Sequence, residues 1–184
     1  YVKNDDEYVK VTEYFNARLP KYNIRDLGFR EKLWLYQSYL WYSFLVQDFL
    51  SCYKYSRQWV DLFYTNPEMM KLNPVFFLRG NQYLLEALFF IRHHDKFKDA
   101  LVKLETITKE KWFPKNDNVE SLTFLYVYSN KFNLHFMEGT FHEGLPLVDE
   151  VLVGIKKHKS RIDEHHIMVF YYKIASLYFG IAEN

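Results

Sequence analysis

The chain has 184 residues, and its 16 Tyr, 17 Phe and 4 Trp make one residue in five aromatic. This apolar content excludes a disordered chain and is enough for one sizeable core. The 24 Lys and Arg nearly balance the 23 Asp and Glu, so the formal net charge is +1. Such a charge gives no support for a nucleic-acid-binding or membrane-surface protein.

Two further features limit the class of protein. No apolar run approaches the roughly 18 residues that a membrane span requires. The single cysteine, Cys52, excludes an intramolecular disulfide and a metal cluster built on cysteines. Together with the lack of a signal-peptide pattern, this cysteine usage favours the cytoplasm.

Hydrophobic periodicity predicts helices throughout and no strand. In the first half of the chain, Asp5 and Asp6 favour a helix start, Pro20 follows a helix end, and Asn73-Pro74 combines a capping residue with the first helical position. The four helices expected here cover about 5–19, 30–50, 53–64 and 74–93.

The second half of the chain is expected to hold four more helices. Asp117 and Glu120 resemble a capping box, and Pro146 lies early enough in its helix to be tolerated. The long and short helices alternate with short connections, which favours antiparallel hairpins within a single all-α domain over residues 1–184. The expected ranges are about 96–110, 117–138, 140–158 and 160–184.

A weak repeat runs through this helical pattern. The turn-and-aromatic motif Tyr53-Lys54-Tyr55 recurs as Asp95-Lys96-Phe97 and as Gly139-Thr140-Phe141, at steps of 42 and 44 residues. A period of this size is typical of arrays in which each helix pair buries its apolar face only when a neighbour stacks on it.

The repeat resembles the tetratricopeptide-repeat (TPR) superfamily, in which an aromatic follows the turn of each hairpin and a small residue comes three positions later. Phe97 with Ala100, and Phe141 with Gly144, follow this pattern. The resemblance implies a right-handed superhelical solenoid of antiparallel hairpins. The standard period is about 34 residues, so other helical-hairpin arrays with longer repeats remain open.

Both ends of the chain fall within expected hairpins. One more step of 44 residues from Phe141 lands one position beyond Asn184, and Tyr8 falls in a second helix without its first. We therefore expect a fragment of a longer repeat protein. Its final helix should expose an apolar strip with Ile174, Tyr178 and Phe179, through which the chain could self-associate.

No catalytic, cofactor or metal motif is found. The pairs His93-His94 and His165-His166 point about 100° apart on a helix, whereas two ligands on one helix need a spacing of three or four residues. Cys52 ends an apolar helix and is expected to be a buried, inert thiol. The basic stretch 156–161 suits a helix C-terminus. We therefore expect no enzyme, no cofactor and no nucleic-acid partner.

The TPR resemblance implies a binding groove along the first helix of each pair. It supports a non-enzymatic scaffold that binds a protein or peptide, because amide side chains beside large aromatics suit polypeptide groups. The alternative is a regulatory sensor module that binds a small peptide or metabolite and controls an attached output domain; an enzyme with an all-α core is a third class. The implied groove residues are Ser43, Gln47, Gln82, Arg92, Tyr126, Ser129, Asn133, Phe136, Tyr172 and Ser176.

Overall fold

The computed structural model of the chain describes residues 2–19 and 22–183, and within these ranges every regular element is a helix. This confirms the predicted all-α class. The α-helices of these ranges are α1 (Asp5–Asn16), α2 (Phe29–Leu45), α3 (Phe49–Thr65), α4 (Glu68–Leu72), α5 (Pro74–Phe90), α6 (His94–Lys109), α7 (Asp117–Glu138), α8 (Pro146–His158) and α9 (Glu164–Glu183). Short 3-10 helices lie at Ile24–Asp26 and His142–Gly144.

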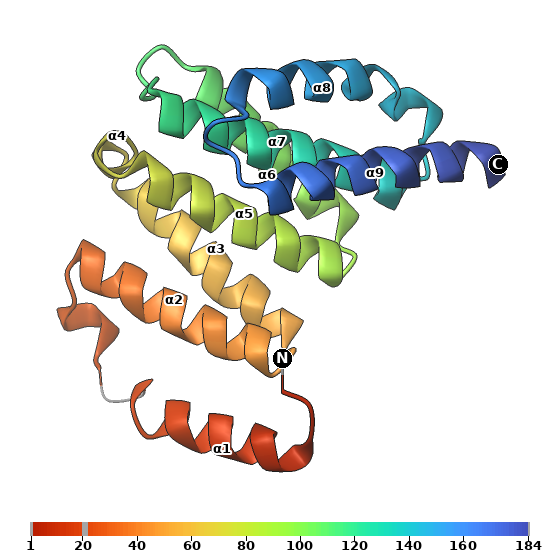
Figure 1. Cartoon of the computed structure of the whole chain (residues 1–184). Helices are drawn as coiled ribbons and strands as arrows, with labels where there is room; N and C mark the ends of the chain where they lie inside the picture. Colours follow the sequence, from red (N-terminus) through yellow and green to blue (C-terminus); the bar gives the residue numbers. More distant parts are fainter. Residues whose placement is uncertain (1, 20–21, 184) are drawn as a thin grey trace.

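Three hairpins make up most of the molecule, α2 with α3, α5 with α6 and α7 with α8. The helix α3 also packs on α5, and α7 contacts α5, α6, α8 and α9. As a result, α5, α7 and α9 lie side by side (Figure 1). The first helix, α1, has no buried residue and contacts α2.

Three of the expected helices end earlier than predicted, and the first of them ends at Asn16 instead of residue 19. The second ends at Leu45 instead of residue 50, because Gln47 adopts a left-handed conformation with φ of 59°. The fourth ends at Phe90 instead of residue 93, because Arg92 has φ of 54°. In the first of these turns Asp48 accepts a hydrogen bond from the Ser51 N–H (3.0 Å), which caps α3 and moves its start to Phe49.

Other boundaries also differ from the expectation. The helix expected over 140–158 is divided, because a 3-10 turn precedes Pro146 and α8 begins at that proline. The last helix begins at Glu164, and α4 is an additional short helix. The residues Pro20 and Asn184, which entered two of the predicted helix ends, lie outside the described residues.

Left-handed residues mark the three hairpin turns more clearly than the aromatic motif does. They are Gln47, Arg92 and Gly139, where φ is 69°. The motif itself does not give equivalent positions. Phe97 is fully buried within α6, whereas Phe141 is half-buried and precedes α8, because Pro146 delays the start of that helix.

The largest core cluster joins α2 to α7 and includes Trp59 of α3. Trp59 is fully buried, and its indole N–H donates a hydrogen bond to the Phe76 carbonyl oxygen (3.0 Å). Gly80 of α5 faces the indole so closely that an added Cβ would lie 2.4 Å from its Cδ1 atom. This glycine therefore permits the close approach of α3 and α5.

Cys52 belongs to a smaller cluster between α2, α3 and α5, where it is fully buried. Burial raises the pKa of its thiol to about 12. The thiol is therefore protonated and inert at neutral pH, as the sequence suggested.

The final helix exposes part of the apolar strip that was expected. Phe179 is 70% exposed and Tyr178 is 52% exposed. Ile174, by contrast, packs against the core cluster formed by α7, α8 and α9. The expectation is therefore confirmed for the two aromatic residues and is wrong for Ile174.

The Trp59–Gly80 contact makes a stability prediction. Gly80→Ala should lower the free energy of unfolding by about 1–3 kcal/mol, because the added methyl group overpacks the site. Urea denaturation would measure the loss. Lys103→Ala is the control, because Lys103 is exposed on α6 and its replacement by alanine adds no atom to the core. Equal stability of Gly80→Ala and the wild type would contradict the prediction.

Candidate functional site

Three adjoining pockets lie along the face that α2, α5, α7 and α9 share. The first, the α7 pocket, has a volume of about 300 Å³ and lies between α5, α7 and the start of α9. The second, the aromatic pocket, has about 570 Å³ and shares Tyr83 and Glu86 with the first. The third, the turn pocket, has about 500 Å³ and shares Phe89 and Phe90 with the second. We refer to the three together as the groove.

Most of the residues that the sequence placed in a groove line these pockets. The α7 pocket holds Gln82, Tyr126 and Ser129, and the aromatic pocket holds Asn133. The turn pocket holds Arg92 and Phe136, although Arg92 lies in the turn after α5 and not within the helix as expected.

The structure does not bring the other four residues into these pockets. Ser43 is buried, and its hydroxyl donates a hydrogen bond to the Tyr39 carbonyl oxygen (2.8 Å). Gln47 is exposed in the turn that ends α2, and so it is not on the helix where it was expected. Tyr172 and Ser176 lie on α9 but line none of the three pockets.

Besides Arg79 of the α7 pocket, sequence reasoning missed the two charged residues of the aromatic pocket, Glu86 and Lys173. Both left a signal. Glu86 follows Gln82 by four residues and therefore lies on the same helix face. Lys173 is the only charged residue between His166 and Glu183, within an otherwise apolar helix.

A chain of hydrogen bonds joins these two charged residues across three helices. Lys173 Nζ of α9 donates to Asn133 Oδ1 of α7. Asn133 Nδ2 donates to Asn130 Oδ1 (3.2 Å), and Asn130 Nδ2 donates to Gln82 Oε1 of α5 (2.7 Å). Gln82 Nε2 then donates to Glu86 Oε1 (2.8 Å). Asn130 is fully buried, so this chain fixes polar groups within the packed helices.

Burial shifts both charged groups toward their neutral forms. It raises the pKa of the Glu86 carboxyl group, while the hydrogen bond from Gln82 and the charge of Lys173 oppose this shift. It lowers the pKa of Lys173 to about 8, against the attraction of Glu86. None of the ion pairs within the described ranges involves Glu86 or Lys173. Both groups therefore keep the capacity to bind a charged ligand.

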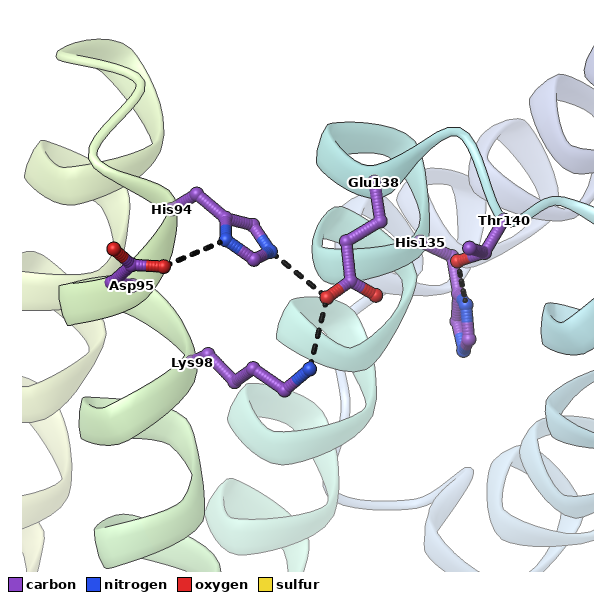
Figure 2. Close-up of polar contacts among 6 residues, drawn as sticks. All are labelled: His94, Asp95, Lys98, His135, Glu138 and Thr140. Carbon is purple, nitrogen blue, oxygen red and sulfur yellow. Dashed lines mark hydrogen bonds and ion pairs between the residues drawn. The ribbon is translucent and has the colours of Figure 1, made fainter.

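Figure 2 shows a second polar cluster, formed by His94, Asp95, Lys98 and Glu138. It borders the turn pocket, because His94 is one of the residues that line that pocket. His94 Nε2 lies 2.8 Å from Glu138 Oε1, and Lys98 Nζ lies 3.1 Å from the same oxygen. The hydrogen bonds to Glu138 and then to Asp95 raise the pKa of His94. Although burial opposes it, the bonds from His94 and Lys98 lower the pKa of Glu138. This cluster ties the start of α6 to the end of α7.

Comparisons of the chain with models of protein families, with curated proteins and with solved structures find no match. Among the described residues, no three His, Cys, Asp or Glu side chains are arranged to hold a metal ion. None of the described helices has the length and apolar character to cross a bilayer. The groove itself offers aromatic surface, amide donors and acceptors, and side chains of both charges, which suits a ligand with both apolar and polar groups.

The His94–Glu138 contact predicts a pH dependence of stability. Since folding raises the pKa of His94 above 6.5, the contact stabilises fully below that pH and its contribution is lost as the pH rises through the raised value. Between about pH 6 and 8, the range in which histidine titrates, the wild type should lose more unfolding free energy than Glu138→Gln. Urea denaturation at several pH values would compare them. Parallel pH profiles would contradict the prediction.

The burial of Lys173 leads to a second prediction about titration. Its ammonium group should titrate near pH 8, because the folded helices remove it from water. NMR of the lysine side-chain nitrogens would detect one such signal, and Lys173→Met would assign it. Glu86→Gln should lower the pKa of Lys173 further, since it removes an attractive charge. A Lys173 signal that titrates close to 10.5 would contradict the burial of this amine.

Proposed function

We propose that the chain is a non-enzymatic binding protein with a TPR-like stack of helical hairpins, and that a polypeptide segment binds along the groove. One observation carries this proposal. Six of the ten residues that the repeat pattern predicted for a groove line three adjoining pockets on one face. The recurrence of left-handed turns at Gln47, Arg92 and Gly139 supports the repeat architecture.

The chemistry of the groove suits a polypeptide. An extended peptide presents backbone donors and acceptors between side chains of varied polarity. Gln82, Ser129 and Asn133 offer both kinds of hydrogen-bonding group, while Phe89 and Phe136 offer apolar surface. Arg92 is exposed at one end, where an acidic side chain of the peptide could pair with it.

The alternative is a sensor module that binds a small peptide or metabolite in one pocket. The position of Glu86 favours this alternative, because the carboxyl group faces both the α7 pocket and the aromatic pocket. In a sensor, occupation of either pocket would change the chain of amides that connects α5, α7 and α9.

A displayed library of random peptides would test the proposed function directly. Peptides selected on the wild-type chain should bind at least about tenfold more weakly to Ser129→Trp, since an indole would fill the α7 pocket and remove several polar contacts. Val102→Trp is the matched control, because Val102 is exposed on α6 and away from the three pockets.

Two readouts decide the outcome. Thermal denaturation should show both variants folded, and calorimetry should show peptide binding lost only in Ser129→Trp. If the selected peptides bind wild type and Ser129→Trp equally, or if the library yields no peptide that binds the wild type, the polypeptide-binding proposal fails.

A further inference from the structure

The aromatic pocket exposes an unusual amount of apolar surface. Trp41 of α2 is 55% exposed and Phe90 of α5 is 49% exposed, although both line the pocket. Phe44 and Phe89 complete the aromatic wall. Exposed aromatic surface around a cavity is typical of a ligand-binding site, because covering it removes apolar area from water.

The same pocket also has polar lining groups, and they carry both signs of charge. Lys173, Asn133 and Glu86 line it. Lys173 has three N–H donors, of which the bond to Asn133 uses one. Glu86 accepts from Gln82 through Oε1, which leaves Oε2 for a ligand. Both charged groups line the pocket and have hydrogen-bonding capacity that these two bonds do not use.

A ligand that contacts these polar groups must interact favourably with the charges of both Lys173 and Glu86. A simple carboxylate, such as a fatty acid, would pair with Lys173 but would bring a negative charge close to Glu86. A simple amine would have the converse problem with Lys173. Glu86 and Lys173 already attract each other. A ligand with one charge would disturb this balance, whereas a compact ligand with an ammonium and a carboxylate close together would keep it.

We propose that the aromatic pocket binds a free hydrophobic amino acid. The α-ammonium group lies at Glu86, the α-carboxylate lies at Lys173 and Asn133, and the side chain packs against Trp41, Phe44 and Phe89. The volume of about 570 Å³ leaves room for a large side chain. The aromatic pocket is one part of the groove. The inference differs from the proposed polypeptide binding in its ligand, because a segment within a peptide chain has no free α-amine and α-carboxylate on one residue.

Calorimetric titration with L-phenylalanine and two matched derivatives tests the inference. N-acetyl-L-phenylalanine lacks the charged amine, and L-phenylalaninamide lacks the carboxylate. Each should bind at least about tenfold more weakly than L-phenylalanine, because each loses one charged hydrogen-bonded contact. L-alanine should also bind weakly, since it lacks the group that would contact the aromatic wall.

Variants of the chain show which residue binds each charged group of the ligand. Lys173→Met should remove the preference for L-phenylalanine over the amide, and Glu86→Gln should remove the preference over the N-acetyl derivative. Lys103→Met is the matched control, because Lys103 is exposed on α6 and lines a different pocket. Binding should also change the tryptophan fluorescence of the wild type, and that change should be lost in Trp41→Phe.

The outcomes separate this inference from the proposed function. Failure of L-phenylalanine, L-leucine and L-tryptophan to bind at millimolar concentration would overturn the inference. Equal binding of L-phenylalanine and either derivative would overturn it as well, since a single charge would then be sufficient. Neither result affects the selection of peptides by the groove, which Ser129→Trp tests independently.

Discussion

The close packing of the Trp59 indole on Gly80 determines where α5 lies, and the groove depends on α5. The contact with Gly80 fixes the distance between α3 and α5. The indole N–H of the same side chain donates to the Phe76 carbonyl oxygen, which fixes how far one helix is shifted along the other. Gln82, Tyr83 and Glu86 then follow on the adjacent turns of α5 and line the pockets. Trp59 also contacts the Tyr83 ring, with centroids 5.9 Å apart, so a residue of the core directly holds one of the side chains that line the pockets.

The buried amide chain adds a second constraint on the same helices. Asn130 of α7 is fully buried, and it bonds Gln82 on one side and Asn133 on the other. A buried amide is costly without partners, so rotation of α5 or α7 about its own axis would leave polar atoms unpaired. The apolar contacts between these helices are less directional. The amides therefore select one arrangement among several that would bury similar apolar area.

The sequence was sufficient for the helical class and for most of the helices, because strong periodicity and the Asn73-Pro74 and Gly139 signals leave a direct trace. It was insufficient for the turns at Gln47 and Arg92. Residues of these types rarely adopt positive φ, so no local pattern indicates that the helices end there. The surrounding contacts impose the conformation. For the same reason, the aromatic motif gave a repeat register that the helix boundaries do not follow.

Among the groove residues, too, some could be predicted from the sequence and others could not. The register taken from the TPR resemblance found Gln82, Tyr126, Ser129 and Asn133, which lie on the middle turns of α5 and α7. It failed at Tyr172, because a shift of one residue rotates a side chain by about 100° around a helix, and Lys173 faces the pocket instead. The roles of Glu86 and Lys173 depend on the packing of three helices that are distant in sequence, and no spacing within one helix contains that information.

The burial of Cys52 has a practical consequence for spectroscopy. It is the only cysteine of the chain, and its thiol is both inaccessible and protonated at neutral pH. A second cysteine placed on an exposed helix position would therefore be the only thiol that a maleimide reagent could modify. Two cysteines introduced in this way would carry a pair of fluorescent or spin labels that report distances between helices, with no need to replace Cys52 first.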